Sequence, residues 1–120
     1  MLNLDTHIVI HAFRGSLSRS ERKILESDSW GISTIVLWEI FKLVQLGRIE
    51  MDFEDPELLR ALNSFHAWPI TYDVCRSIGD LDFRADPADE IIAATSLLHG
   101  APLVTRDRRL RASKVVPVAT

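Results

Sequence analysis

Short apolar runs alternate along the chain with longer segments that carry helical signals. The runs predict strands at 2–5, 31–33, 68–71, 102–105 and 115–118. The longer segments predict helices at about 18–27, 34–46, 55–67, 73–79 and 86–99, with a short basic helix after Thr105. Strands that alternate with helices favour an α/β fold whose parallel sheet is covered on both faces.

Residues that start and stop helices support these boundaries. Ser18 and Glu21 have the spacing of a capping box. The Asp-Pro pairs at 55–56 and 86–87 place an N-cap before a first-turn proline. Gly47 and Gly100 are typical helix stops. Nine of the twelve positions from 35 to 46 are apolar, so we expect that helix to be largely buried.

The size of the chain fits one domain over residues 1–120. Its 120 residues are 47% hydrophobic, which is enough for one core and argues against disorder. The single cysteine, Cys75, is expected to be a buried thiol in a reducing compartment. The start of the chain lacks a signal-peptide pattern, and the longest run without Asp, Glu, Lys or Arg, 91–105, is too short for a membrane span. We therefore expect a cytoplasmic protein with no membrane partner.

The charges are segregated although their sum is modest. The formal net charge of −3 argues against nucleic-acid binding by bulk positive charge. Residues 50–90 hold eleven acids and three bases, whereas residues 106–114 hold five bases and one acid. A nucleic-acid partner thus remains open if the basic segment lies near the site.

Four acids are placed where a parallel sheet binds its ligands. Asp5 and Asp107 follow predicted strands, and Glu39 and Asp89 lie in early turns of predicted helices. Ligands bind beyond the carboxyl ends of such strands, so the four carboxylates are expected to converge. Clustered carboxylates repel one another unless protons or cations neutralise them, and Mg²⁺ or Mn²⁺ suits an all-oxygen site.

Each acid also has a purely structural interpretation. Asp5, Asp86 and Asp107 could cap the segments that follow them. Glu39 could form a solvent-facing pair with Lys42 on its own helix. Asp89 could serve the helix dipole at a third helical position. No single position decides between structure and chemistry, and the argument for a site depends on their joint arrangement.

The motifs taken together resemble the PIN domain, with VapC-like toxins of bacterial toxin–antitoxin pairs as the best match. The resemblance covers essentially the whole chain, in order and at the expected spacing. It rests on Leu4-Asp5-Thr6-His7, Leu37-Trp38-Glu39-Ile40, Asp86-Pro87-Ala88-Asp89, Ile91-Ile92-Ala93-Ala94 and Leu103-Val104-Thr105-Arg106-Asp107.

The resemblance implies a three-layer α/β/α fold and a metal-dependent ribonuclease. It assigns the family's acids to Asp5, Glu39, Asp89 and Asp107, with Asp86 as an additional acid. Thr6 and Thr105 match positions where a hydroxyl orients a carboxylate or water. The chain departs from the commonest pattern at Ala88 and Glu90, where a bulky apolar residue and a base are usual.

The expected chemistry is endonucleolytic cleavage of structured RNA. One or two Mg²⁺ ions, held by Asp5, Asp89 and Asp107 with Glu39 assisting, would activate a water for in-line attack, which leaves a 5′ phosphate. The basic residues expected to contact flanking phosphates are Arg106, Arg108, Arg109 and Arg111.

The resemblance also implies partners. The family usually forms homodimers and is silenced by a small antitoxin. The apolar helix over 35–46, with Trp38 and Phe41, is a candidate surface for that antitoxin. The alternative is that at least one of the two aromatic residues belongs to the domain's own core.

Other functional classes remain as alternatives. The chain could be a catalytically inactive PIN-like binding module, although all four acids are present. A phosphoacceptor signalling domain would need an acid pair after the first strand, where Asp5 stands alone, and a lysine at the rim, which Lys114 does not match well. His7 and His11 have helical zinc-ligand spacing but lack a recognisable third ligand.

Overall fold

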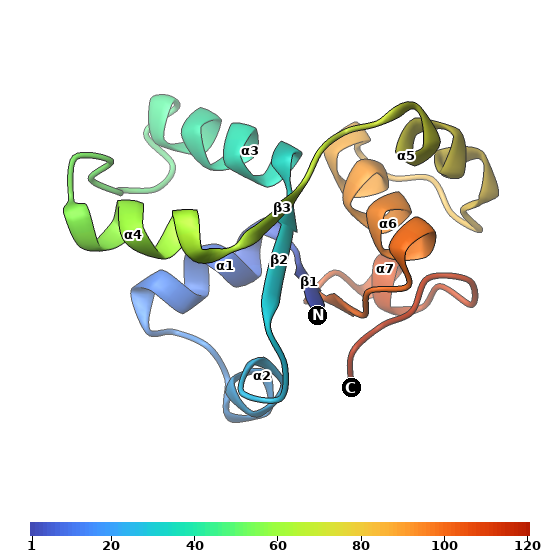
Figure 1. Ribbon diagram of the computed structural model, residues 1–120, viewed down its shortest axis with the longest axis horizontal. Coiled ribbons are helices and arrows are strands. Elements are labelled where there is room, and N and C mark those ends of the chain that lie inside the picture. The colour runs from blue at the N-terminus through green and yellow to red at the C-terminus, as the bar shows by residue number, and fades with distance from the viewer.

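The computed structural model describes residues 1–120 as alternating strands and helices (Figure 1). The strands are β1 (Leu2–Leu4), β2 (Trp30–Ser33), β3 (His66–Trp68) and β4 (Leu103–Val104). The helices are α1 (Thr6–Arg14), α2 (Arg19–Leu25), α3 (Thr34–Gln45), α4 (Pro56–Ser64), α5 (Tyr72–Ser77), α6 (Pro87–His99) and α7 (Arg108–Arg111), with a 3₁₀ turn, η1, at Ile78–Asp80.

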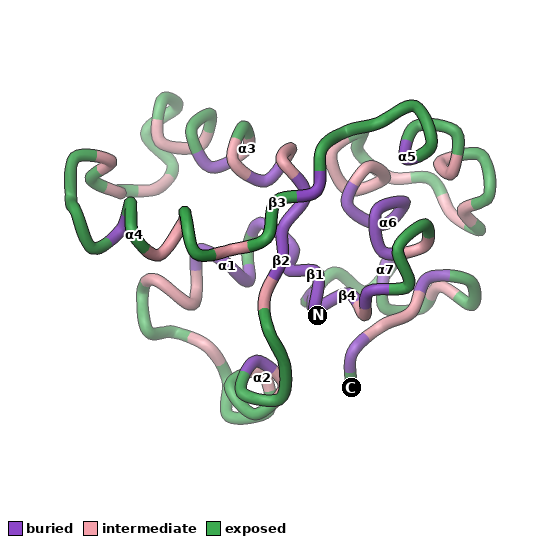
Figure 2. The backbone as a smooth tube through the Cα atoms, in the orientation of Figure 1, coloured by how far each residue is buried: buried purple, intermediate pink, exposed green.

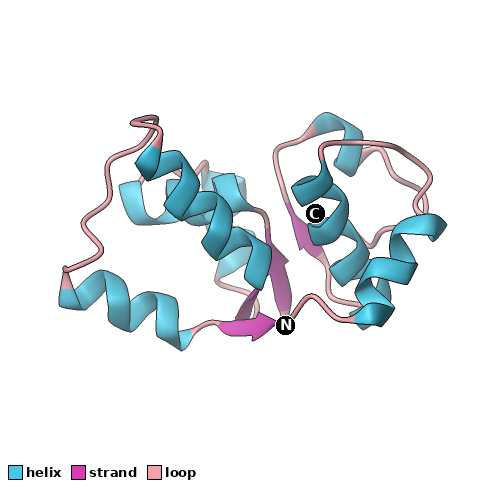
Figure 3. Ribbon diagram, turned by 90° about the horizontal axis from the view of Figure 1, so that it is seen from above, coloured by secondary structure: helices cyan, strands magenta, loops and turns pink.

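The four strands form one parallel sheet in the order β3-β2-β1-β4. Seen from above, α1, α3 and α4 lie on one side of the sheet and α5, α6 and α7 on the other (Figure 3). The predicted three-layer α/β/α arrangement is confirmed. Because all four strands run in the same direction, their carboxyl ends meet at one edge.

Three of the start and stop signals in the sequence operate as expected. Ser18 accepts a hydrogen bond from the Glu21 amide, and Glu21 accepts one from the Ser18 amide, which completes the capping box of α2. Asp55 caps α4 through the Glu57 amide. Gly100 ends α6 with φ 65°, a left-handed conformation that favours glycine over residues with a Cβ atom.

The structure departs from the predicted elements at three places. A nine-residue helix, α1, fills 6–14, where only a cap at Asp5 was predicted. The third strand lies at His66–Trp68 rather than 68–71, since α4 ends at Ser64. The predicted last strand is reduced to one bridge between Leu103 and Val118.

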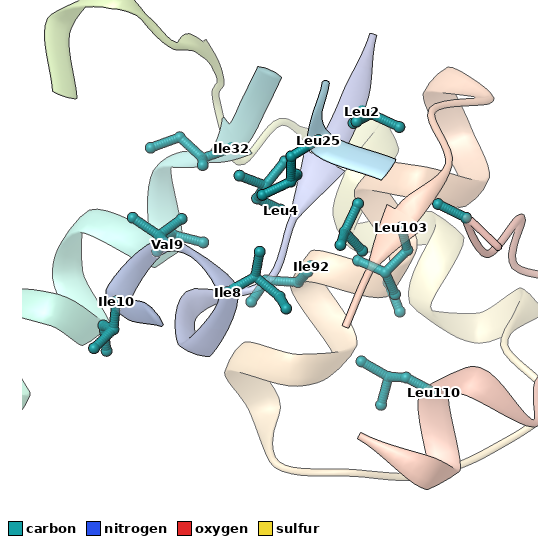
Figure 4. Packing of buried hydrophobic residues seen from close by; sticks show 14 of the residues in the cluster. Leu2, Leu4, Ile8, Val9, Ile10, Leu25, Ile32, Ile92, Leu103 and Leu110 are labelled. Carbon is teal, nitrogen blue, oxygen red and sulfur yellow. The ribbon is translucent and has the colours of Figure 1, made fainter. Parts of the chain in front are cut away.

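The core lies on both faces of the sheet and is centred on β1 and β2 (Figure 2). Leu4 of β1 and Ile32 of β2 pack with Ile8 and Val9 of α1, and Ile92 of α6 joins the same cluster (Figure 4). All five are at most 1% exposed. None of the helices has the length and apolar character needed to cross a membrane.

The helix α3 is less buried than its composition predicts. Only Val36 and Ile40 are buried in it, whereas Trp38 is 58% exposed and Phe41 53% exposed. The expectation that one of the two aromatic residues lies in the core is wrong. Cys75 is also exposed, contrary to the prediction of a buried thiol.

A buried amide joins β1 to α6. The fully buried Asn3 donates from Nδ2 to the Ile92 carbonyl at 3.0 Å and to Ser96 Oγ at 2.9 Å. Polar atoms in a core are expensive unless they are paired, so these bonds favour one alignment of α6 along β1. That alignment matters because β1 leads directly into Asp5 and α6 carries Asp89, two acids of the candidate site.

Gly31 of β2 lies directly beneath the indole ring of Trp68. A Cβ atom at this position would lie 2.6 Å and 2.7 Å from two ring carbons. We predict that Gly31→Ala destabilises the fold by about 1–3 kcal/mol, because the ring must shift from its packed position. Urea denaturation monitored by circular dichroism measures this change.

Gly79→Ala is the matched control. A Cβ atom there meets nothing within 4 Å, and its φ is not positive. We expect little change in the free energy of unfolding for this control. Equal stability of the two alanine variants would contradict the close packing at Gly31.

Candidate active site

The predicted acids gather at the carboxyl edge of the sheet. Asp5 follows β1, and Asp107 lies three residues after β4. Glu39 lies in the second turn of α3, which follows β2 directly, and Asp89 lies in the first turn of α6. The four acids influence one another electrostatically, with Asp89 under the influence of the other three. The structure therefore brings together the four acids that the sequence singled out.

Asp5 is the most buried acid, at 5% exposed. Its Oδ1 accepts the Thr6 amide at 2.8 Å, and its Oδ2 accepts the Thr105 hydroxyl at 2.6 Å. The hydroxyl of Thr105 in turn accepts the amide of Asp107 at 3.1 Å. Burial raises the pKa of Asp5 above its ordinary value, although these two hydrogen bonds act in the opposite direction. Asp5 thus caps α1 and also belongs to the acid cluster.

Glu39 is bound to Thr6 rather than to Lys42. The Thr6 hydroxyl donates to the Glu39 carboxylate at 2.5 Å, whereas Lys42 contacts Gln45 at 2.8 Å. The alternative of a solvent-facing Glu39–Lys42 pair is therefore wrong. Burial, followed by the nearby charge of Asp5, raises the pKa of Glu39 despite the hydrogen bond from Thr6. Thr6 and Thr105 each hold one carboxylate, in agreement with the roles that the family resemblance implied.

The pKa of Asp89, which lies partly buried among the other acids, is strongly raised. Partial burial and then the charges of Asp5 and Glu39 raise its pKa from its ordinary value of 3.8 to about 6. Its neighbours Asp107 and Asp86 act in the same direction. A carboxyl group with such a pKa, in a cleft of like charges, is typical of a functional site.

Asp107 caps the helix that follows it, whereas Asp86 does not. Asp107 caps α7 through its Oδ1, which accepts the Arg109 and Leu110 amides at 2.8 and 3.1 Å. Asp86 occupies the N-cap position of α6 but makes no capping hydrogen bond. The carboxylate of Asp86 is exposed and faces the acid cluster, where it adds negative charge.

Two adjoining hollows open over Asp5, Asp89 and Asp107, whereas Glu39 lines neither of them. One, of about 260 Å³, is lined entirely by polar residues, namely Asp5, His7, His11, Asp89, Arg106 and Asp107. The other, of about 570 Å³, is lined by Ala85, Asp86, Asp89, Asp107, Arg108 and Arg109. A more apolar hollow of about 600 Å³ beside α1 and α4 has Asp28 as its only acid. The two polar hollows are therefore the candidates for an active site because of the acids that line them and not because of their size.

The arginines near the acids differ in their freedom. Arg106 forms a salt bridge with Glu21, and Arg111 donates to the Thr105 carbonyl at 3.1 Å. Arg109 lines the larger polar hollow and donates one N–H to the Arg84 carbonyl. Arg108 lines the same hollow, and its guanidinium makes no hydrogen bond within the protein. Arg108 and Arg109 are thus the two best placed to meet an anionic ligand.

The histidines of α1 do not form a ready zinc pair. Both ring nitrogens of His11 are engaged, Nδ1 with Ser16 Oγ at 2.7 Å and Nε2 with Arg106 at 2.9 Å. His7 is exposed and lines the smaller polar hollow beside Asp5. His7 and His11 were considered from the sequence only as a zinc pair. Their place at the rim of the site depends on the course of α1, which was not predicted.

The donor set suits a hard divalent cation by its chemistry. It consists of carboxylate oxygens, and burial first, with repulsion between the acids adding to it, disfavours the ionised forms of Asp5, Glu39 and Asp89 and raises their pKa values. A hard cation bound to these oxygens would offset both effects. No three of these side chains are arranged closely enough to hold an ion as they stand. Binding therefore requires side-chain rotation, for which Asp89 is free because its carboxylate accepts no hydrogen bond within the protein.

The chain belongs to the PIN-domain family, whose sequence model matches residues 3–115. It is similar to Ribonuclease VapC22 of Mycobacterium tuberculosis, with 32% identity over 117 aligned residues that cover 92% of this chain and 90% of the relative. Family membership agrees with the resemblance seen in the motifs and sets aside the phosphoacceptor alternative.

Solved structures share the fold at lower identity. A toxin–antitoxin complex from Klebsiella pneumoniae matches with a TM-score of 0.72 and 24% identity, covering 100% of this chain and 97% of the other. VapBC2 from Rickettsia felis, bound to a DNA fragment from its promoter, matches with a TM-score of 0.73 and 19% identity, covering 98% and 97%. FitAcB from Neisseria gonorrhoeae matches with a TM-score of 0.72 and 21% identity, covering 100% and 97%.

The raised pKa of Asp89 predicts a pH-dependent stability without metal. A carboxyl group whose pKa is higher in the folded state disfavours folding once it ionises. The free energy of unfolding of Asp89→Asn minus that of wild type should therefore increase as the pH rises from about 4 to about 6. Above that pH the difference should stay constant. Urea denaturation in chelator, at several pH values, measures the difference between the two proteins.

The difference in stability between Asp89→Asn and wild type is the quantity to compare, because other groups titrate in both proteins. The pKa of His11 is lowered, mainly by burial, which gives the opposite trend in the same range. Asp80→Asn, an exposed acid at the end of η1, serves as control. A difference for Asp89→Asn that stays constant from pH 4 to 7 would contradict the electrostatic account.

Proposed function

We propose that this protein is a divalent-metal-dependent endoribonuclease that acts as the toxin of a toxin–antitoxin pair. The observation that carries the proposal is the convergence of Asp5, Glu39, Asp89 and Asp107 at the carboxyl edge of a PIN-domain sheet, with the pKa of Asp89 raised to about 6. Support for the nuclease class comes from the similarity to Ribonuclease VapC22.

The cation ligands would be Asp5, Asp89 and Asp107, with Glu39 in a supporting position. When bound, Mg²⁺ or Mn²⁺ lowers the pKa of water and offsets the negative charge that develops at phosphorus. Thr105 would orient Asp5 and favour its ionised form through the hydrogen bond at 2.6 Å. Thr6 would do the same for Glu39.

The reaction follows from the charges. A phosphodiester can approach the acids only when a cation offsets their repulsion. Water would then attack phosphorus in line with the 3′ oxygen, and the bond from phosphorus to that oxygen would break. The departing oxygen would take up a proton as a 3′ hydroxyl, and the other product would carry a 5′ phosphate. The proposal covers one or two ions and a structured RNA as substrate.

The arginine tail would position the RNA backbone. Arg108 and Arg109 line the larger polar hollow beside Asp86 and Asp89, so they would take phosphates that flank the scissile bond. Arg111 contributes positive charge nearby, although its guanidinium is bound to the Thr105 carbonyl. Glu90, adjacent to Asp89 in the sequence, would repel RNA phosphate near the start of α6.

The partner would be a small antitoxin protein that docks on α3. Trp38 and Phe41 expose large apolar side chains there, and Phe41 stacks on Phe53 with ring centroids 4.0 Å apart. Exposed aromatic clusters are typical of protein interfaces. A solved structure with the same fold is a toxin–antitoxin complex from Klebsiella pneumoniae, which supports an antitoxin partner. A homodimer, formed elsewhere on the surface or by part of the same patch, completes the proposed assembly.

Cleavage of RNA is the direct test. We expect wild-type protein to cleave structured RNA with Mg²⁺ or Mn²⁺ and to stop in chelator. Asp5→Asn and Asp89→Asn should each lose more than about 100-fold in rate, because each removes a proposed metal ligand. The 5′ ends of the products, mapped by sequencing, report both the target and the 5′ phosphate.

Asp80→Asn is the matched control and should cleave as wild type does. Full activity of Asp5→Asn and Asp89→Asn would show that the ligand assignment is wrong. A well-folded wild-type protein that cleaves no RNA under any metal condition would instead indicate the inactive binding module.

Exposed aromatic residues allow a test of the partner surface. Trp38→Ala should weaken co-purification with the small protein encoded beside this chain, by more than about tenfold in affinity, because buried Trp residues dominate interface energies. Tyr72→Ala, at a 77% exposed aromatic residue on α5, is the control. Equal loss in both variants, or loss in neither, would remove α3 from the proposed interface.

A further inference from the structure

The guanidinium of Arg106 is almost fully engaged within the protein. Its Nε and Nη2 donate to the two carboxylate oxygens of Glu21, each at 2.7 Å, and Nη2 also donates to the Ser16 carbonyl at 3.2 Å. The remaining nitrogen, Nη1, lies 2.9 Å from His11 Nε2. Four of the five N–H groups of an arginine are thus used. Arg106 was predicted from sequence as a phosphate contact, but it has only one N–H left to offer.

The protonation state of His11 follows from this contact. Arginine only donates hydrogen bonds, so His11 Nε2 must accept and Nδ1 must carry the proton that it donates to Ser16 Oγ. Burial and then the charge of Arg106 lower the pKa of His11, in agreement with a neutral ring. The histidine therefore adds a fixed acceptor to the network rather than a second positive charge.

The carboxylate of Glu21 is well suited to hold the guanidinium. Its side chain is only 14% exposed, and the hydrogen bonds from Arg106 lower its pKa to about 2. A two-point contact between Arg and a carboxylate fixes direction as well as charge. The pair joins α2 to the loop that follows β4, across 85 residues of sequence.

That loop carries two residues of the acid site. Thr105 and Asp107 flank Arg106 directly, and Thr105 is bound to Asp5 on the inner side of the loop. The Glu21 contact holds the same loop from the outer side. The two attachments act on consecutive residues and together fix the backbone from which Asp107 projects.

We propose that Glu21 is a positioning residue of the nuclease site, which acts through Arg106 to hold the loop of Thr105 and Asp107 in the cation-binding arrangement. This inference rests on the proposed function. It assigns Arg106 to the support of the site rather than to RNA. The competing interpretation is that Glu21 occupies Arg106 only until an RNA phosphate replaces it.

Glu21→Gln separates these interpretations. Glutamine suits the same position of a capping box, so the start of α2 is preserved while the charge that holds Arg106 is lost. We expect Mn²⁺ affinity, measured by isothermal titration calorimetry without RNA, to fall about tenfold. The kcat should fall at saturating RNA and subsaturating Mn²⁺, while the KM for RNA changes less than about twofold.

Two further variants complete the design. Glu26→Gln, at an exposed acid at the end of the same helix, should match wild type in Mn²⁺ affinity and in kcat. Arg106→Lys keeps the positive charge but loses the two-point contact, so it should reproduce the weaker Mn²⁺ binding. It also answers the question independently should Glu21→Gln fold poorly.

The outcomes are distinct. Unchanged Mn²⁺ affinity in both Glu21→Gln and Arg106→Lys overturns the inference. A lower KM for RNA in Glu21→Gln, with metal binding intact, also overturns it, because it shows that Arg106 released from Glu21 binds RNA phosphate. Wild-type protein that neither binds Mn²⁺ nor cleaves RNA refutes the proposed function itself, and with it the inference.

Discussion

The burial of one carboxylate, Asp5, at the end of the central strand is the constraint around which the rest of the site is arranged. A carboxylate removed from water needs hydrogen bonds or a cation. The Thr6 amide and the Thr105 hydroxyl supply the bonds. Those two bonds attach the start of α1 and the loop after β4 to the same side chain. The remaining negative charge of the cluster is left for a cation to neutralise.

Much of the fold could be predicted because its signals are local. The capping box at Ser18 and the stop at Gly100 depend only on neighbouring residues, and both are in place. The helix α1 was missed because its apolar residues Ile8, Val9 and Ile10 are consecutive, and a short apolar run without helical spacing does not identify a helix. The third strand was misplaced because β3 pairs only with β2 at the edge of the sheet, where the pairing partner rather than an apolar pattern decides the strand.

The site shows the same division between local and distant information. The four acids could be picked out because parallel strands bring their carboxyl ends to one edge. The partners of those acids could not, since Glu39 binds Thr6 across 33 residues and Arg106 binds Glu21 across 85. The sequence left the face of α3 open between a core and a surface, because an apolar composition does not distinguish the two, and only the structure shows that Trp38 and Phe41 are exposed.

The hydrogen bond between Asp5 and Thr105 joins residues 100 positions apart. During synthesis Asp5 is made 100 residues before Thr105. The acid cluster therefore cannot assemble until Thr105 and Asp107 have also left the ribosome, however well the segment up to β3 has folded. The order of synthesis thus delays the complete site until both parts of it are available.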